Sequence, residues 1–237
     1  QPGDELAYLF LGHAARRQGD PISAQHHYEA ALAANPGYAR ALLSLADLQY
    51  MAAAGNCQPG GCDRAGVHRA IDAYLAVTAA DDAEYANIPA KKSFAIGRAY
   101  TCLTLAGEPE MQPAATAALE EVIATYEAGD ERLADIAAEA YQLLGLLLRT
   151  STGPQRLADL ESADAQFARA IELSTHDERK AVFYLHRAEI QAGLGRCDQA
   201  SQHLDAAEDL AARVPATTAS LAAFLEEAQA VVAACRD

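Results

Sequence analysis

Cysteine is the residue type in this sequence with the most chemistry open to it, and two of the five cysteines lie close together. Cys57 and Cys62 flank a Gly/Pro-rich stretch. Three states are open to them: a disulfide across the stretch, two free thiols, or a metal site completed by His68. Two cysteines and one histidine at irregular spacing match no zinc-binding motif, so we expect no metal.

The other polar residues form no recognisable catalytic motif. The sequence contains neither a phosphate-binding loop nor a dinucleotide fingerprint nor a nucleophile elbow. His26 and His27 are neighbours on a predicted helix, so their side chains diverge. Acidic pairs such as Glu120 with Glu121 are typical of solvated helix faces. We therefore expect a protein that is not an enzyme and carries no cofactor.

The charge of the chain excludes some partners. It has 33 acidic and 18 basic residues, a formal charge of −15, which argues against binding to nucleic acid or to an anionic membrane surface. No run of 18 apolar residues is present, so we expect no membrane insertion. The chain begins at Gln1 without Met, and we expect a piece of a longer protein.

A repeated pattern dominates the organisation of the chain. Residues 5–36 combine an aromatic residue, Leu and Gly with a later Ala, a second aromatic residue, Ala and a closing Pro. The positions are Tyr8, Leu11, Gly12, Gly19, Asp20, Ala24, Tyr28, Ala31, Leu32, Asn35 and Pro36. Small residues let two antiparallel helices approach closely, and large residues fill the space between hairpins. This segment resembles a tetratricopeptide repeat.

Further copies with longer turns follow, and the resemblance covers almost the whole chain. It implies an all-α fold, a right-handed superhelical stack of antiparallel helical hairpins that forms one domain over 1–237. We expect repeats at 5–36, 39–82, 84–128, 130–175 and 177–213, and a capping helix at 216–235. The apolar stripe of this last helix, which includes Leu221, Phe224 and Val232, is suited to cover the final hairpin.

The predicted hairpins bring two distant cysteines together. Cys197 lies at the start of the fifth hairpin's second helix, and Cys235 lies at the end of the antiparallel cap. A disulfide between them would pin the cap. Cys102 is then left over, and we expect it to behave as a small apolar residue. Two candidate pairs and one unpaired cysteine favour an extracytoplasmic, oxidising compartment over the cytoplasm.

The resemblance also implies a concave groove, lined by the first helix of each hairpin, in which peptides or partner helices bind. The repeat register places 25 residues on this surface, and six of them are basic, where an even spread of the chain's 18 would give about two. The groove residues that we expect to bind a partner are His13, Arg16, Arg17, Arg40, Leu43, Asp47, Tyr50, Lys91, Phe94, Arg98, Gln142 and Arg149.

This basic groove predicts a partner protein or peptide with acidic residues or a C-terminal carboxylate. Tyr50 and Phe94 would serve as apolar anchors. In the alternative, the basic residues neutralise acidic residues of neighbouring helices and bind no ligand. The family's carboxylate clamp for chaperone tails is not expected, because Leu9, His13 and Ser44 occupy positions where that clamp has Lys or Asn.

The function indicated by these observations is a non-catalytic interaction module, an adaptor or scaffold that holds a protein or peptide. One alternative is a regulatory or sensor domain of a larger enzyme or signalling protein. Another is self-association, in which an exposed helical face pairs with a second copy to form a homo-oligomer.

Overall fold

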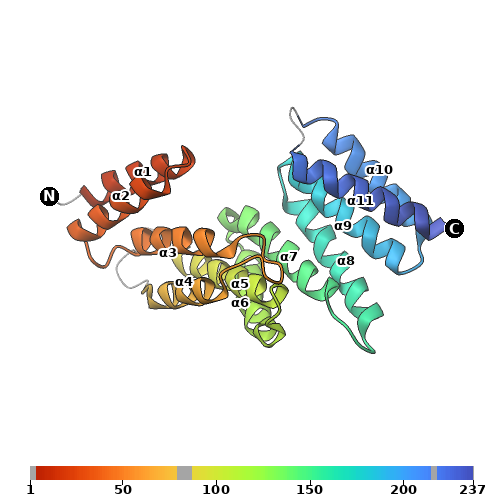
Figure 1. The fold of residues 1–237 in the computed structure, drawn as a ribbon, viewed down its shortest axis with the longest axis horizontal. Helices are drawn as coiled ribbons and strands as arrows, with labels where there is room; N and C mark the ends of the chain where they lie inside the picture. Colours follow the sequence, from red (N-terminus) through yellow and green to blue (C-terminus); the bar gives the residue numbers. More distant parts are fainter. Residues whose placement is uncertain (1–3, 79–86, 215–217, 237) are drawn as a thin grey trace. The chain divides into compact units, whose positions relative to one another are not determined.

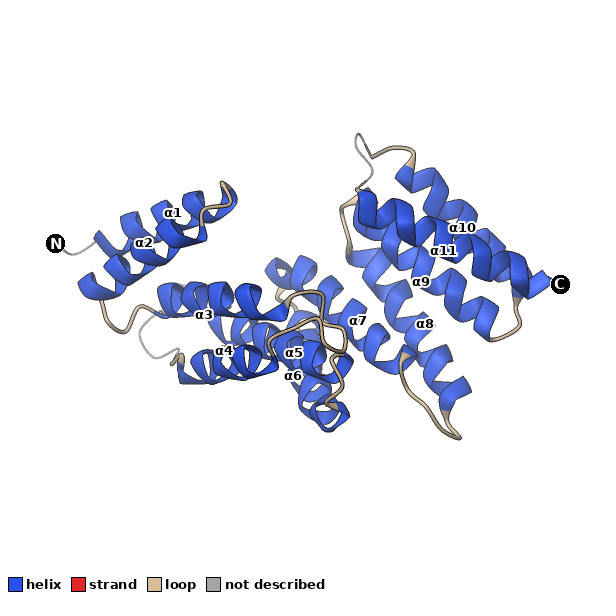
Figure 2. Ribbon diagram, in the orientation of Figure 1, coloured by secondary structure: helices blue, strands red, loops and turns tan. Residues whose placement is uncertain are grey.

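The computed structural model describes residues 4–78, 87–214 and 218–236, and this part of the chain consists of helices joined by turns (Figures 1 and 2). Two short 3₁₀ turns, Pro109–Met111 and Glu131–Leu133, precede α6 and α7. The helices are α1 (Asp4–Arg17), α2 (Pro21–Ala34), α3 (Ala39–Ala54), α4 (Arg64–Ala76), α5 (Ile88–Leu105), α6 (Gln112–Glu127), α7 (Ala134–Arg149), α8 (Arg156–Leu173), α9 (Asp177–Gly193), α10 (Cys197–Ala211) and α11 (Ala219–Arg236).

Local sequence signals explain where several helices begin. The Asp20 side chain accepts a hydrogen bond from the Ser23 backbone N–H at 3.0 Å, and Pro21 occupies the first turn of α2. Asp63 caps α4 in the same way through the Gly66 N–H. Because these caps satisfy backbone donors that lack intrahelical partners, the turns of these two hairpins are well defined.

The expected repeats and the described helices can be compared range by range. The pairs α1–α2, α3–α4, α5–α6, α7–α8 and α9–α10 correspond to the five ranges, with α1 beginning one residue earlier at Asp4, and α11 corresponds to the cap. Residues 1–3, 79–86 and 215–217 lie outside the described residues. So do the expected end of the second range, the start of the third and the start of the cap. The right-handed superhelix stays a prediction.

The chain divides into two compact units, Gln1–Glu121 and Val122–Asp237. In the N-terminal unit, one apolar cluster fills the first hairpin and reaches α3, with Leu9, Tyr28 and Ala31 almost completely buried. A second cluster joins α3, α4 and α5 around Val67, Tyr74 and Leu103. The unit is therefore held together by contacts within hairpins and between consecutive hairpins.

The C-terminal unit is closed by its last helix. Leu221, Ala228 and Val232 of α11 are buried in a cluster with residues of α9 and α10. The buried His186 ring of α9 stacks on Phe167 and packs against Phe224 of α11, each at a ring-centroid distance of 4.7 Å. Burial lowers the pKa of His186, which favours its neutral form. The neutral ring packs between α8 and the closing helix α11.

In two hairpins, a glycine on the first helix lets the second helix approach closely. A Cβ atom placed on Gly145 of α7 would lie 2.7 Å from Cε2 of Phe167, a fully buried ring of α8. Gly97 of α5 meets Leu119 of α6 in the same manner, with the nearest carbon at 2.8 Å. A side chain at either position would force the two helices apart.

One of the two disulfides joins the cysteine pair proposed from the hairpins, and the other joins a pair that was not considered. Cys197 is bonded to Cys235, which ties the start of α10 to the end of α11. Cys57, however, is bonded to Cys102 of α5, 45 residues away, and Cys62 is a free thiol. The possible Cys57–Cys62 disulfide and the expected unpaired Cys102 are therefore wrong, because packing of α3 on α5 brings the loop over the buried Cys102.

Two further expectations concern metals and membranes. His68 Nε2 lies 2.9 Å from Oε2 of Glu108, and Cys57 is held in its disulfide. Within the described ranges no group of three or more His, Cys, Asp or Glu side chains is arranged to hold a metal ion. Among the helices described here, none combines the length and the apolar character that a bilayer crossing requires.

Replacing Gly145 with Ala should separate α7 from α8. We expect Gly145→Ala to lower the free energy of unfolding by about 1–3 kcal/mol because the new methyl overlaps the Phe167 ring. Gly193→Ala is the matched control, since the nearest atom to its Cβ position is Leu160 Cδ1 at 3.9 Å. Urea unfolding measures both, and equal stability of the two variants would contradict this account of the packing.

The cysteine connectivity can be checked by mass. Digestion of the oxidised protein without reduction should release a peptide pair that joins Cys57 to Cys102, with Cys62 the only one of the three that reacts with an alkylating agent. Cys102→Ser should reduce stability by about 2–4 kcal/mol, whereas Cys62→Ser should leave it unchanged. A Cys57–Cys62 peptide in the wild type would contradict the structure.

Candidate partner-binding surface

The inner residues of the first hairpin gather positive charge around His13. This side chain is half-buried, with Nε2 3.2 Å from Oγ of Ser44 on α3 and its ring edge-on to Tyr28. Burial lowers the pKa of His13, and the nearby positive charges of Arg16, Arg17 and Arg40 lower it further. Residues of α1 and α3 that are 23 to 27 positions apart in sequence therefore share one positive region.

Arg98 of α5 forms the centre of a polar cluster in the same unit. Its Nη2 donates to Oδ1 of Asp47 at 2.8 Å, and the Tyr74 hydroxyl donates to the same oxygen at 2.7 Å. Burial and the charge of Asp47 raise the pKa of Tyr74 far above its ordinary value, so Tyr74 stays protonated and acts as a donor. The cluster ties α3, α4 and α5 together.

Aromatic rings enclose the Arg98 guanidinium. Its Cζ lies 4.5 Å from the centroid of the Tyr50 ring and 5.7 Å from that of Phe94, which are cation–π distances. Tyr50 and Phe94 are only 8% and 9% exposed, and Leu43 is 8% exposed. The predicted role of Tyr50 and Phe94 as groove anchors is therefore wrong: they pack against Arg98 inside the unit and offer little surface to a partner.

The C-terminal unit uses its predicted groove residues in ion pairs. Arg149 Nη1 donates to Oε2 of Glu189 in a short contact between α7 and α9. Arg179 of α9 reaches Oε1 of Glu139 on α7 at 2.6 Å. Gln142 lies in the same region, where it lines a shallow hollow together with Glu139, Glu178, Arg179, Val182 and Phe183.

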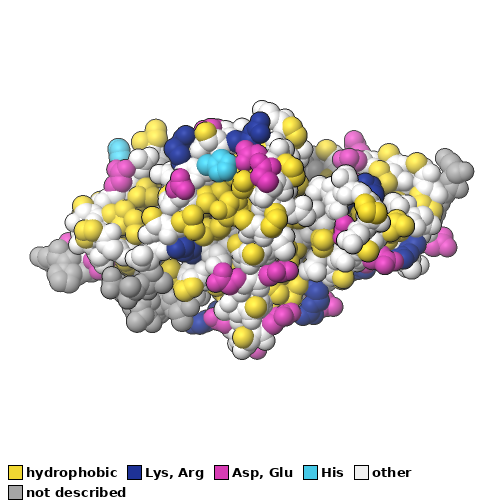
Figure 3. Space-filling model, turned by 90° about the horizontal axis from the view of Figure 1, so that it is seen from below, with side chains coloured by type: hydrophobic (Ala, Val, Ile, Leu, Met, Phe, Trp, Pro, Cys, Tyr) yellow, Lys and Arg dark blue, Asp and Glu magenta, His cyan; other side chains and the backbone are white. Residues whose placement is uncertain are grey.

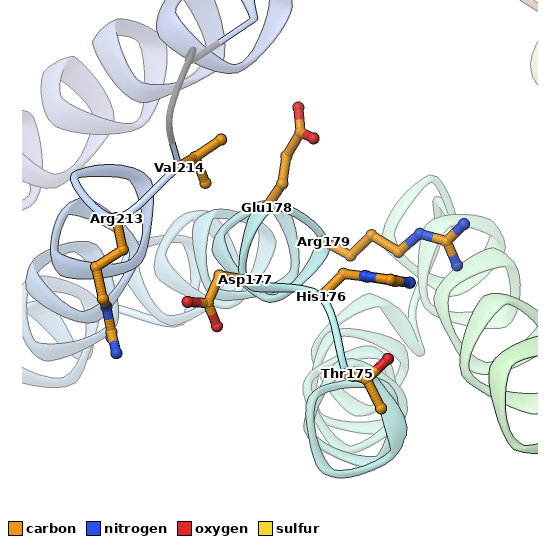
Figure 4. A pocket seen from close by; sticks show the side chains of 7 residues that line it. All are labelled: Thr175, His176, Asp177, Glu178, Arg179, Arg213 and Val214. Carbon is orange, nitrogen blue, oxygen red and sulfur yellow. The ribbon is translucent and has the colours of Figure 1, made fainter.

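A second hollow surrounds the start of α9 (Figure 4). Thr175, His176, Asp177, Glu178, Arg179, Arg213 and Val214 line it. Figure 4 shows the Asp177 side chain directed towards the side of Arg213, whereas Arg179 extends away towards α7. Because its lining mixes both signs of charge, this hollow has no preference for an anion or a cation.

The basic residues of the predicted groove are of two kinds: some form ion pairs with neighbouring helices, and others do not. Three carboxylates on the first helices of their hairpins are matched: Asp47 by Arg98, Glu139 by Arg179 and Glu189 by Arg149. Neutralisation between helices, the alternative interpretation of the basic excess, therefore accounts for Arg98 and Arg149. By contrast, Arg16, Arg17 and Lys91 are exposed and form no ion pair with the described part of the chain.

Sequence reasoning missed the residues that complete these clusters. Tyr74 and Arg179 lie outside the predicted groove set, Tyr74 on a second helix and Arg179 at the first turn of α9. The signal for Tyr74 was its place in the repeat pattern, which indicates burial but not the hydroxyl's partner. Arg40 lies on α3, with its Cζ 4.9 Å from the centroid of the Tyr38 ring, and its place in a groove stays a prediction.

Comparison with solved structures identifies the fold. The crystal structure of the MamA protein aligns with a TM-score of 0.56 at 19% identity, over 92% of this chain and 99% of that one. TTC0263, a thermophilic TPR protein of Thermus thermophilus, aligns with a TM-score of 0.58 at 20% identity, over 95% and 99%. The chain is thus similar to these proteins in fold, an all-α helical-repeat stack of tetratricopeptide type.

Comparison by sequence gives no match. No protein-family model matches the chain, and no curated protein matches it either. The lengthened turns, such as residues 55–63 between α3 and α4, depart from the strict repeat length and agree with this result.

Replacing Arg98 should lower the stability of the protein, whereas replacing an exposed basic residue should not. We expect Arg98→Met to lower the free energy of unfolding by about 1–3 kcal/mol, because Asp47 then keeps only the Tyr74 hydroxyl among these partners. Lys91→Met, an exposed change on the same helix, should leave stability unchanged. Urea unfolding of both variants decides the point, and an equal effect would show that the Arg98 cluster is not structural.

Proposed function

We propose that the chain is a non-catalytic interaction module whose N-terminal unit binds an acidic segment of a partner protein on the inner sides of α1, α3 and α5. One observation carries this proposal: the exposed Arg16, Arg17 and Lys91 remain without acidic partners in the described residues, although the chain has 33 acidic side chains. The two neighbours in fold are of tetratricopeptide type, which supports the interaction class but names no partner.

The geometry favours an extended segment with several carboxylates. Arg16 follows His13 by one turn of α1, Arg40 lies in the first turns of α3, and Lys91 lies in the first turn of α5. These positions are spread over three helices, so one isolated carboxylate could not contact all of them. Arginine also binds carboxylates in a bidentate manner, which adds orientation to the attraction.

The rest of the protein is acidic, and the selectivity of the proposed site for acidic ligands would depend on its local positive charge. With a formal charge of −15, the chain as a whole repels acidic ligands at a distance. Attraction must therefore come from a local positive region and should weaken as salt screens it over about 8–10 Å. Figure 3 shows one face of the molecule, where acidic and basic side chains border a hydrophobic area.

The test compares an acidic peptide with an isosteric peptide in which Asp and Glu are replaced by Asn and Gln. Wild-type protein should bind the acidic peptide more tightly, and Arg16→Glu or Lys91→Glu should each weaken that binding about fivefold or more. Fluorescence anisotropy of labelled peptides at two salt concentrations measures the affinities.

Arg156→Glu is the matched control, because it reverses one exposed charge at the start of α8 in the C-terminal unit. It should leave the affinity within about twofold of wild type. Equal weak binding of both peptides to all four proteins would reject the basic surface as a binding site.

A further inference from the structure

His13 lies where three helices of the N-terminal unit meet, beside the proposed binding surface. It belongs to α1, and its Nε2 atom is 3.2 Å from Oγ of Ser44 on α3. Its ring lies edge-on to the Tyr28 ring of α2, at a centroid distance of 5.6 Å. The His13 side chain is half-buried, so it keeps some contact with water and can exchange a proton with it. Because histidine ordinarily changes its charge between pH 5 and 8, pH can change the charge of this surface.

Most of the charge that faces His13 is positive. Burial has the largest effect on the pKa of His13 and lowers it, and three arginines lower it further. They are Arg16 and Arg17, three and four positions further along α1, and Arg40 on α3. In the free protein, His13 is therefore mostly neutral at pH 7.

The other groups that face His13 offset this positive charge only weakly. Asp47 of α3 raises the pKa of His13, but it has the smallest effect of the groups around the ring. Its Oδ1 atom already accepts hydrogen bonds from Arg98 and Tyr74. On α2, burial raises the pKa of the Tyr28 hydroxyl, which therefore stays uncharged. An acidic ligand would supply the negative charge that Asp47 supplies only in small part.

We propose that His13 makes the binding of the acidic segment depend on pH, so that the segment binds more tightly when the His13 ring is protonated. This inference rests on the proposed function, since it concerns the same surface. Carboxylates that bind Arg16 and Arg17 come close to His13 and favour its charged form. A hydroxyl can donate or accept, so Ser44 can keep its hydrogen bond to Nε2 in either charge state of the ring.

The direction of the effect follows from this exchange of charge. The bound carboxylates raise the pKa of His13 above its value in the free protein, so the complex takes up a proton as it forms. Affinity therefore rises as the pH falls through the pKa of His13 in the complex, and it levels off below the pKa of His13 in the free protein. Because a single charge near solvent is involved, we expect a gain of about five- to tenfold, at the lower end of couplings between two ligands.

Fluorescence anisotropy of a labelled Asp-rich peptide, at constant salt from about pH 8 to about pH 5.5, measures this dependence. Aspartate side chains, with an ordinary pKa of about 3.9, stay ionised over the whole range. Wild type should bind the peptide about three- to tenfold more tightly at the lower pH. His13→Gln, which stays neutral, should match wild type within about twofold at pH 8 and gain less than about twofold as the pH falls.

His26→Gln is the matched control, because it removes an exposed histidine of the same hairpin, on α2. It should keep the pH dependence of wild type. The same pH dependence in wild type and His13→Gln overturns the role of His13, although the acidic site then stands. A peptide that at no pH binds better than its Asn counterpart overturns both the proposed function and this inference.

Proton NMR of the His13 ring gives a second readout that does not depend on the affinity measurement. The ring signal is assigned by its loss in His13→Gln. Its titration midpoint should lie at a higher pH with saturating peptide than without, because binding and protonation are reciprocal. An unchanged midpoint overturns the inference. Far-UV circular dichroism at both ends of the pH range checks that each variant keeps its helices.

Discussion

The rest of the structure depends on the distance between the two helices of each hairpin. Gly12, Gly97 and Gly145 occupy corresponding positions on the first helices of three hairpins, and each lies under a large side chain of the second helix: Tyr28, Leu119 or Phe167. Because no Cβ fits beneath these side chains, the helix pairs approach to one fixed separation. That separation fixes which side of each first helix is buried, and hence which side is left for partners.

Much of this could be predicted from the sequence because the hairpin is a local structure. The glycine and the aromatic residue that covers it lie 16 positions apart in the first repeat, and the caps lie within three residues of the helices they start. Such signals need no knowledge of tertiary packing, so the helix pairs and the closing helix could be placed. The fold of the two similar solved structures agrees with that interpretation.

The contacts that were missed join residues far apart in the chain. Arg98 and Asp47 are 51 positions apart, and Cys57 and Cys102 are 45 apart, with an insertion in one hairpin between them. Pairing Cys57 with its neighbour Cys62 was reasonable by sequence distance, but the partner was decided by α3 packing on α5. Likewise, the repeat register placed Tyr50 and Phe94 on the correct helices but could not show that Arg98 lies between them.

Packing between helices also explains which basic residues have acidic partners and which do not. In a chain with a formal charge of −15, a half-buried guanidinium such as that of Arg98 needs a carboxylate and polar or aromatic neighbours, and it has them. Exposed basic residues have no such need, because water solvates them at little cost. Arg16 and Arg17 are adjacent in sequence and both exposed, and the positive charge of each lowers the pKa of the nearby His13. Packing therefore accounts for Arg98, whereas the exposed arginines of α1 have no ion-pair partner in the described residues, and this is where we propose that an acidic segment binds.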